Sequence, residues 1–553
     1  MASQDSEIPV LIVGAGVAGL TASLFLSHHG ISSIIFERRS GTSIHPRARS
    51  VNARTMELFR HLRIDERVKE AGASLSASKG IYQGATLKDV IESKPRVEEK
   101  REFPLAKYVE GIGPVRGTFV TQDHLEPVLV DAVRERSGEI RWNTELTSFS
   151  QDSSSVTATV KHLTDGATST LRAQYLIAAD GAKSPIRTQL NVPTLGAGTL
   201  GHLLNILFTA DLEALVKNRE FSLCLIKRPE VTGLFTSINN SDRWVFHLSY
   251  DPTKGETPED FPPERCIELL KIALGIPEID INIISVLPWE PSVRVVEKMQ
   301  HGRIFLAGDA AHQMPPYGGQ GANSGIVDAH NLAWKIAAVI NGQAPDALLE
   351  TYDEERFPAG LEAAEASGAG VDDRGLLSLK KDWTVIKGWA RKLPLLSGHG
   401  YGYTSKAIGE EYTGPLRGWT WTPWTLPALG LGLDGRPGRR VPHVWIEKAG
   451  QRISTLDLCG KGFVLLAGAD GEAWEDAAKQ VGNAVGVEII SHCINSKGEV
   501  VAEEGAFEVA AGISSGGALL VRPDDFVAWR ARKRLGNGQE QLEQAMRQVL
   551  CLE

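Results

Sequence analysis

Val10-Leu-Ile-Val13 runs directly into Gly14-Ala-Gly16-Val-Ala-Gly19, and this stretch indicates the fold of the N-terminal part of the chain. The four consecutive apolar residues predict a buried strand of a parallel sheet. Residues 17–28 then carry apolar side chains at helical spacing, and a second apolar run, Ser33-Ile-Ile-Phe36, ends at the acid Glu37. The order of strand, glycine turn, helix, strand and acid predicts a Rossmann-like βαβ unit.

Each glycine of this turn has a mechanical role in binding a dinucleotide. Gly14 permits the tight turn, Gly16 lets the backbone approach a pyrophosphate, and Gly19 lets the helix pack closely on the strand. The helix N-terminus offers unpaired N–H groups to the phosphates. Glu37 lies 18 residues after Gly19, near the separation of about 20 at which an acid binds ribose hydroxyls. The site suits either NAD or FAD.

Two further motifs favour FAD. In residues 175–187 an apolar run ends at Asp180-Gly181, and in residues 302–312 another ends at Gly308-Asp309. An acid at a strand end can hold the hydroxyls of the ribityl chain. A glycine-rich loop follows the second motif and runs to Asn323, where a long apolar-faced helix begins.

The glycine-rich loop suits a flavin ring. Gly318, Gly319 and Gly321 have no Cβ, so their backbone can lie against a flat surface. The helix N-terminus near Ala322 and Asn323 directs partial positive charge at the bound group. Reduced flavin carries negative charge, which this arrangement stabilises.

The composition excludes several other classes of protein. The chain has 553 residues, 42% of them hydrophobic, and a net charge of −9, which argues against a disordered chain and a nucleic-acid or membrane-surface binder. Its five cysteines are widely spaced and form no CxxC motif, so we expect neither a disulfide framework nor a metal site. With no secretory signal and no apolar stretch of about 18 residues, a cytoplasmic protein is predicted.

In type, order and spacing, the three motifs resemble those of the FAD-dependent aromatic hydroxylases, the single-component flavoprotein monooxygenases. Segments 49–60, 122–126, 328–335 and 349–356 are also similar to that family, and the resemblance covers about residues 8–375. It implies FAD as a cofactor. Besides the three glycines of the first turn and Glu37, the implied FAD-binding residues are Arg38, Arg47, Gln122, Asp180, Asp309, Pro316, Gly319, Gly321, Ala322 and Asn323.

A weaker resemblance reaches the C-terminus. Segments 437–445 and 520–530 are similar to a subgroup of polyketide and phenol hydroxylases that carries an extra thioredoxin-like domain. The sequence is compatible with that fold, with strands at 462–467, 487–490 and 519–521 and helices at 473–481 and 539–550. The turn at 468–472 contains no cysteine, so we expect this domain to pack or oligomerise rather than to carry out redox chemistry.

These observations and the resemblance together predict an α/β fold with three domains. A Rossmann-like FAD-binding domain is built from residues 1–185 and 295–375. It is interrupted by a substrate-binding domain with a mixed β-sheet, residues 190–294. A linker helix at 376–399 leads to the thioredoxin-like α/β domain at 400–553, which lacks CxxC.

The resemblance also implies an activity. In this family NAD(P)H reduces the flavin, O2 then gives a flavin C4a-hydroperoxide, and one oxygen atom enters an electron-rich aromatic carbon. The expected enzyme is therefore an NAD(P)H-dependent hydroxylase of a small phenolic or polyketide-derived substrate in secondary metabolism. Arg49, His247, Tyr250 and Tyr317 are the candidate catalytic or substrate-contacting residues, and His312 is expected to be structural.

Some alternatives stay open. Epoxidation and Baeyer–Villiger oxidation use the same oxygenating species, so the motifs cannot separate them from hydroxylation. A flavin oxidase and a flavin-binding protein without turnover are further alternatives, although Asp180, Asp309 and the glycine loop argue against the latter. The sequence leaves open the choice between NADH and NADPH, the oligomeric state, for which a homodimer is one option, and the identity of any base.

Overall fold

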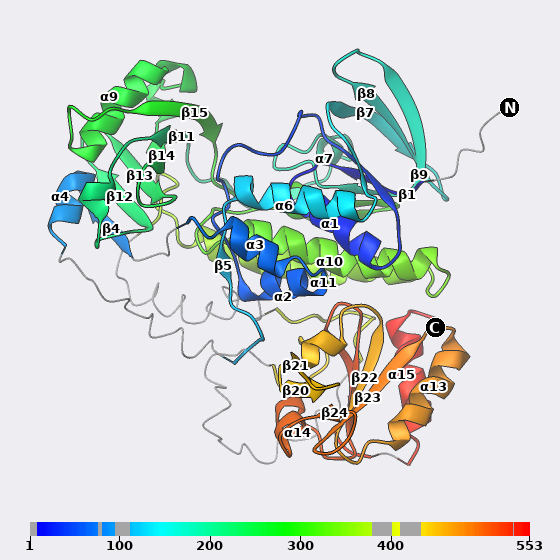
Figure 1. Ribbon diagram of the computed structural model, residues 1–553. Helices are drawn as coiled ribbons and strands as arrows, with labels where there is room; N and C mark the ends of the chain where they lie inside the picture. The colour runs from blue at the N-terminus through cyan, green and yellow to red at the C-terminus, as the bar shows by residue number, and fades with distance from the viewer. Residues whose placement is uncertain are drawn as a thin grey trace.

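The computed structural model describes residues 8–75, 80–94, 111–378, 401–409, 433–534 and 536–552. Figure 1 shows a central α/β part, a second sheet with its own helices at the upper left, and a C-terminal part below. The strand orders confirm the expected α/β class, with a Rossmann-like sheet, a separate mixed sheet and a C-terminal α/β part.

The central sheet has the strand order β17-β18-β9-β1-β2-β6, and a β7-β8 hairpin joins it at β9. Its strands are β1 (Ile8–Val13), β2 (Ser33–Phe36), β6 (Glu139–Arg141), β7 (Thr144–Gln151), β8 (Val156–His162), β9 (Thr168–Ala178), β17 (Gln300–His301) and β18 (Ile304–Leu306). β1 pairs in parallel with β2 and β9, and Val10, Leu11 and Ile12 are fully buried. A strand covered on both faces requires such a continuous apolar sequence.

Helices α1 and α10 pack against each other beside this sheet (Figure 1). The helices of the central part are α1 (Val17–His28), α2 (Ala53–His61), α3 (Asp65–Ala71), α6 (Gln122–Glu135), α7 (Pro185–Gln189), α10 (Gln320–Ile340) and α11 (Ala347–Gly368). α10 lies between α1 and α11, and nearly all of its residues are buried. The charged side chains that it buries, Asp328 and Lys335, are paired with residues of α11.

The parallel pairing brings the three motifs to one edge of the sheet. β9 pairs in parallel with both β1 and β18, so the carboxyl ends of the three strands lie together. The glycine turn at 14–19, the Asp180 turn and the Gly308-Asp309 turn each follow one of these ends. Ligands of open parallel sheets bind outside the carboxyl ends of the strands.

The second sheet has the order β15-β11-β14-β13-β12-β4. Its strands are β4 (Ile81–Gly84), β11 (Leu203–Thr209), β12 (Leu223–Lys227), β13 (Thr232–Ser237), β14 (Arg243–Ser249) and β15 (Asn282–Trp289). One face forms an apolar core with helices α4 (Leu87–Glu92), α8 (Glu213–Val216) and α9 (Pro263–Leu274). A ribbon of β10 (Thr194–Thr199), β16 (Ser292–Val296) and β19 (His312–Gln313) leads back to the central part.

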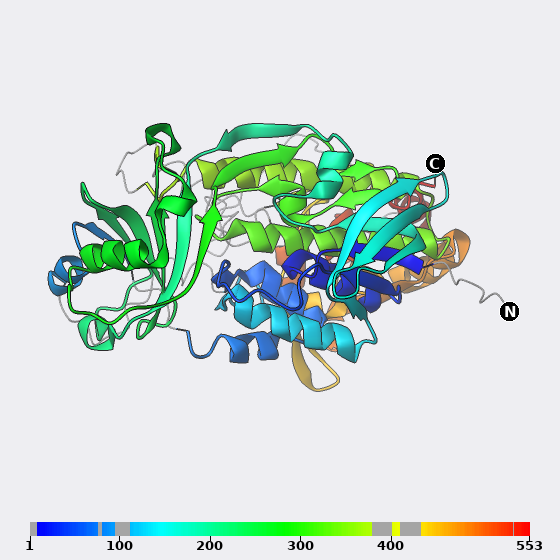
Figure 2. The same cartoon turned by 90° about the horizontal axis from the view of Figure 1, so that it is seen from above.

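The expectation that residues 1–185 all belong to the FAD domain is wrong for one segment. β4 pairs in parallel with β12, and Leu87, Val90 and Ile91 of α4 are buried in the core of the second sheet. Figures 1 and 2 show this blue segment beside the green sheet. Without β4, strand β12 would present a row of unpaired backbone groups at the edge of the sheet.

The C-terminal part is a sheet of order β21-β20-β24-β23-β22-β25-β26 with helices beside it. Its elements are β20 (Trp445–Lys448), β21 (Gln451–Ser454), β22 (Phe463–Ala467), α13 (Ala473–Val485), β23 (Ile489–Asn495), β24 (Val500–Val501), α14 (Ala506–Ala511), β25 (Ala518–Val521), β26 (Val527–Ala531) and α15 (Gly538–Val549). The strands and helices predicted here from the sequence are confirmed, with shifts of a few residues at their ends.

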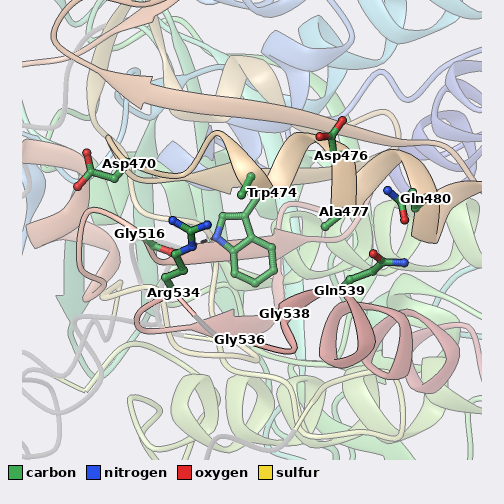
Figure 3. A pocket seen from close by; sticks show the side chains of 11 residues that line it. Asp470, Trp474, Asp476, Ala477, Gln480, Gly516, Arg534, Gly536, Gly538 and Gln539 are labelled. Carbon is green, nitrogen blue, oxygen red and sulfur yellow. Dashed lines mark hydrogen bonds between the residues drawn. The ribbon is translucent and has the colours of Figure 1, made fainter.

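A hollow of about 230 Å³ lies at the start of α13 (Figure 3). Asp470, Trp474 and Arg534 are among its lining residues, and Trp474 Nε1 donates a hydrogen bond to the Gly516 carbonyl at 3.0 Å. None of the described lining residues is a cysteine. The hollow therefore contains no thiol pair of the kind that a redox thioredoxin requires.

Two expectations concern segments between or across the domains. The linker helix expected at 376–399 lies, apart from its first three residues, outside the described part of the chain. Among the helices that the structure describes, none combines the length and apolar character needed to cross a bilayer.

Candidate active site

The glycine turn after β1 has a backbone that other residues cannot adopt without a clash. Gly14 has φ of 104°, and a Cβ there would lie 2.3 Å from the Ala179 carbonyl oxygen. A Cβ on Gly19 would lie 1.9 Å from the Gly14 oxygen. Gly16 begins α1, whose first turn carries no acid and no side-chain cap. The first N–H groups of the helix are thus free to bind an anion.

Glu37 and Arg38 lie at the end of β2, next to this turn. The Glu37 carboxylate accepts hydrogen bonds from the Ala15 and Arg39 N–H groups, each at 2.9 Å. A carboxylate has about four acceptor positions, so Glu37 retains capacity for hydroxyl groups. The Arg38 side chain is exposed beside it.

A second acid, Glu126, lies beside the turn and was missed as a site residue in the sequence. It is buried on α6, accepts from Gln122 Nε2 at 2.6 Å and from the Ser43 N–H at 2.7 Å, and its burial raises its pKa. A Cβ on Gly16 would lie 3.9 Å from its Oε1. Arg47 is exposed and within electrostatic range of Glu126 and Asp309. Glu126 therefore fixes Gln122 and the 43–47 segment next to the glycine turn.

Arg187 joins the other two motifs, a role that the sequence did not reveal. Its Nη2 donates to the Ala182 carbonyl at 2.7 Å, and its Nη1 donates to the Ala310 carbonyl at 2.9 Å. Asp180 accepts the Ile186 N–H at 3.3 Å through Oδ2, while its Oδ1 is buried without a partner among the described residues. An unpaired buried acceptor requires a donor such as a ligand hydroxyl.

The Gly308-Asp309 turn rests on a fully buried acid, Asp328. One oxygen of Asp328 accepts from the Gly308 N–H at 3.0 Å and pairs with His312 Nε2 at 2.7 Å. The other accepts from Arg356 Nε at 2.8 Å, and the pairing with His312 and Arg356 lowers the pKa of Asp328 to about 2. His312 thus supports the turn, in agreement with its expected structural role. The side chain of Asp309 itself points to solvent-accessible space.

The glycine loop before α10 has the open surface that a flat ring needs. Gly318 and Gly319 have φ of 99° and 64°, and Gly319 is the residue that begins the helix. A Cβ on Gly321 would have no neighbour closer than 3.9 Å, and the first turn of α10 carries no acid. Pro316 is exposed before the loop, and Ala322 is half-buried in the first turn of the helix.

Asn323 holds this loop rather than facing open space. Its Oδ1 accepts from the Asn52 N–H at 3.0 Å and from Thr55 Oγ1 at 2.6 Å, and its Nδ2 donates to the Gly319 carbonyl. The amide thus connects the start of α10 to the start of α2. Free helix N–H groups, an orphaned Asp180 oxygen and a Cβ-free loop together fit FAD.

The face of the second sheet that is turned toward this loop is mostly apolar. Leu203, Leu225 and Leu234 cluster there with Tyr317, whose hydroxyl donates to the Gly375 carbonyl at 3.3 Å. Burial raises the pKa of Tyr317. Three of the predicted catalytic residues lie in this region: Tyr317, His247 and Arg49.

His247 lies at the centre of a short polar line on this face. Its Nδ1 is 2.5 Å from Asn205 Oδ1, and its Nε2 is 3.1 Å from Thr236 Oγ1. Burial lowers its pKa to about 3, so the ring is neutral at physiological pH. The arrangement favours a proton on Nδ1 and a lone pair on Nε2.

Tyr250 is separated from this group. It packs with Phe261 in the core on the helix-covered face of the sheet, and its ring lies 6.0 Å from that of Phe261. Tyr250 directly follows β14 and packs in this core, whereas His247 lies on the opposite face of the strand with Asn205 and Thr236. Contrary to the expectation that Tyr250 contacts the substrate, the structure places it with the helix-covered core and not on the face that carries His247.

Arg49 is a cation without an anionic partner in the described structure. Its Nη1 donates to the Ser222 carbonyl at 3.4 Å, its Nη2 is buried without a partner, and its Cζ lies 6.0 Å from the centre of the Phe119 ring. Burial lowers its pKa to about 10, which still leaves it charged at neutral pH. An anion placed beside it would be strongly stabilised.

Comparison with protein families defines the class. A family model described as an FAD binding domain matches residues 7–367, and one described as the C-terminal part of aromatic-ring hydroxylases matches residues 434–551. The chain therefore belongs to the FAD-dependent aromatic hydroxylases, and it is a flavoprotein monooxygenase.

The sequence matches individual relatives over almost its whole length. The chain is 39% identical to tetracenomycin A2 monooxygenase-dioxygenase of Streptomyces glaucescens, over 99% of this chain and 97% of that protein. It is 36% identical to aklavinone 12-hydroxylase of Streptomyces purpurascens, over 99% of both. A solved ternary complex of aklavinone-11 hydroxylase with FAD and aklavinone has a TM-score of 0.83 and 34% identity, covering 99% of this chain and 100% of that one.

Proposed function

We propose that this chain inserts one oxygen atom into a polycyclic aromatic polyketide or a related phenol, with NAD(P)H as the reductant and O2 as the oxygen donor. The relatives named above act on tetracenomycin and aklavinone, which supports this substrate class. The single observation that carries the proposal is the juxtaposition of an apolar sheet face with an unpaired buried cation, Arg49, beside the flavin-type loop.

The apolar face suits a flat, fused-ring substrate. Leucine side chains on three strands and the ring of Tyr317 supply the nonpolar contacts, and the Asn205-His247-Thr236 line supplies a few polar ones. Binding sites for small molecules usually combine a mainly apolar lining with few fixed polar groups. The neutral His247 can orient a substrate hydroxyl or carbonyl without adding charge.

Arg49 is proposed to favour the ionised form of the substrate. A phenolate is more electron-rich at its ring carbons than the phenol, so it is attacked more readily by an electrophilic oxygen. The uncompensated guanidinium would lower the pKa of a phenol bound next to it. Tyr317 would close the pocket on the side of the glycine loop and exclude water.

The proposed FAD contacts come from the three strand-end motifs and the neighbouring segments. They are Gly14, Gly16, Gly19, Glu37, Arg38, Arg47, Gln122, Asp180, Asp309, Pro316, Gly319, Gly321 and Ala322, with Asn323 and Glu126 holding the surrounding backbone. FAD supplies the electron transfer and the activation of O2, and the chain supplies position, charge and exclusion of water. The five free thiols are typical of a reducing compartment, so we also propose a cytoplasmic location.

The test is a set of phenols, naphthols and anthraquinones offered with NADH or NADPH. We expect an accepted substrate to accelerate NAD(P)H oxidation and to gain one oxygen atom, as measured by product mass. A hydroxylated ring supports the proposal, whereas an epoxide or a ring-expanded lactone assigns another reaction to the same site. If no aromatic compound speeds flavin reduction or gains oxygen, the proposal fails.

A further inference from the structure

A buried line of charged side chains joins the C-terminal part to the Gly308-Asp309 turn. Arg522, which follows β25, donates from Nη1 and Nη2 to the two oxygens of Glu355 at 2.6 Å and 2.9 Å. Glu355 lies on α11, and the next residue, Arg356, donates to Asp328 at 2.8 Å. Asp328 in turn accepts the Gly308 N–H at 3.0 Å. Three side chains therefore separate Arg522 from the turn that carries Asp309.

All the charged side chains of this line are buried, so removing one of them leaves the charge of its partner uncompensated. The side chains of Arg522, Glu355, Arg356 and Asp328 are 0% exposed. Lys335 also pairs with Glu355, at 2.8 Å, so the acid faces two cations. Removing one partner of a buried ion pair leaves the other charge uncompensated, and the surrounding elements must shift to hydrate it.

Residues 401–409, which we call the strap, connect the same parts by a second path. The Tyr403 hydroxyl accepts from Arg356 Nη1 at 3.1 Å, and Ser405 Oγ donates to Glu355 Oε1 at 2.6 Å. Tyr401 donates to Gln320 Oε1 at 3.0 Å, at the first residue of α10. The Tyr403 ring also stacks on Phe526 of the C-terminal part, with ring centres 4.1 Å apart.

We propose that Arg522 is a positioning residue for the flavin site. By holding Glu355, it fixes the part of α11 that carries Arg356, and Arg356 fixes Asp328 and the Gly308-Asp309 turn. The C-terminal part then sets the geometry of FAD binding as well as packing on the enzyme. The inference rests on the proposed function only in that FAD binds at these motifs, and it does not depend on the substrate.

The chain offers a matched control in Arg60 of α2. Arg60 makes a two-bonded pair with Asp457 of the C-terminal part, at 2.6 Å and 2.9 Å. This pair also crosses between the two parts, but neither of its members bonds to Glu355, Arg356 or Asp328 among the hydrogen bonds of the described residues. The Arg60 pair is partly exposed, at 33% and 17% of its two side chains, so R60M controls for loss of a contact between the parts, and R522K controls for loss of a buried charge.

The experiment compares R522M, R522K and R60M by titration of apoprotein with FAD and by visible circular dichroism of the bound flavin. We expect R522M to weaken FAD binding about tenfold and to change the flavin spectrum, R522K to recover most of the affinity, and R60M to stay within about twofold of the parent. Neither readout needs a substrate, so a wrong substrate class would not affect the result.

A milder variant keeps the test decisive if R522M does not fold. Y403F removes one hydrogen bond to Arg356 and leaves every buried charge and the ring stacking in place. It should give a smaller change of the same sign, and Y403F combined with R522K should change FAD affinity by less than the sum of the two separate effects. If Y403F binds FAD like the parent with an unchanged flavin spectrum, and a folded R522M does the same, the positioning role is refuted.

Discussion

Arg49 is the residue on which the proposed chemistry depends most. Its guanidinium lies next to the apolar sheet face and has no carboxylate partner among the described residues. We predict that Arg49→Met lowers kcat/KM by about 10²–10³, since removal of a charge that stabilises a reacting anion costs that much in other enzymes. The loss should shrink at a pH above the substrate's own pKa, where the phenolate forms without help.

Arg243→Met is the matched control for this prediction. Arg243 lies on β14 of the same sheet, but its charge is already paired with Asp123 at 2.7 Å. We expect this variant, which leaves Asp123 without its cation, to lower kcat/KM by less than about tenfold and by the same factor at every pH, because a charge already paired with Asp123 does not act on substrate ionisation. Equal losses in the two variants, with the same pH profile, would show that Arg49 does not act on substrate ionisation.

His247 and Tyr250 show what the sequence could have revealed at the scale of single residues. Both were expected near the substrate, but only His247 faces the central part of the molecule. The two residues are three positions apart, at the end of β14 and just after it, so a continued strand alternation places their side chains on opposite faces. Strand periodicity alone could therefore have excluded one of them, although it could not say which.

Two glycines at the starts of helices give a prediction about elements: Gly319, the cap of α10, and Gly19, in the first turn of α1. Gly319 has φ of 64°, but a Cβ there would have its nearest neighbour at 3.7 Å. Gly319→Ala should therefore cost only the backbone strain of about 1–2 kcal/mol and a modest loss of FAD affinity. Gly19→Ala would place a Cβ 1.9 Å from a carbonyl oxygen, so it should displace α1 and abolish FAD binding.

Thermal unfolding of the FAD-loaded protein and FAD titration check this pair of variants. We predict that both the unfolding temperature and the FAD affinity decrease in the order parent, Gly319→Ala, Gly19→Ala. A Gly319→Ala protein that is less stable than Gly19→Ala would contradict the distinction between backbone strain and steric overlap.

The elements that follow from local patterns were predictable, and those that depend on distant contacts were not. The βαβ unit at residues 8–37 and the elements of the C-terminal part were predicted because their apolar periodicity and glycine positions are local. The pairing of β4 with β12 joins segments about 140 residues apart, for which no local pattern exists. The same holds for Glu126 and Arg187, whose importance lies in the backbone groups that they contact across the fold.

At the scale of the whole molecule, buried neutral histidines predict sensitivity to acid. Burial lowers the pKa of His29 and His247 to about 3 and that of His45 and His443 to about 4. Below pH 6.5 the unfolded chain binds protons at these positions, whereas the folded chain does not until much lower pH. Their contribution to stability is therefore complete above pH 6.5 and is lost as the pH falls toward 4.

Each such histidine contributes up to about 1.4 kcal/mol of unfolding free energy per pH unit in this window. Urea unfolding between pH 7 and pH 4.5 should show a shallower pH dependence for His29→Gln than for the parent. An unchanged slope in His29→Gln would show that the acid sensitivity has another origin.

We propose that the three strand-end motifs, the apolar sheet face and Arg49 together make a monooxygenase of aromatic substrates. The most direct measurement supplies isotopically heavy O2 and NAD(P)H with an accepted polycyclic phenol and determines the label in the product. We expect one labelled oxygen atom per product molecule for each NAD(P)H consumed. An unlabelled product, or NAD(P)H consumption that yields only hydrogen peroxide with every aromatic compound offered, would contradict it.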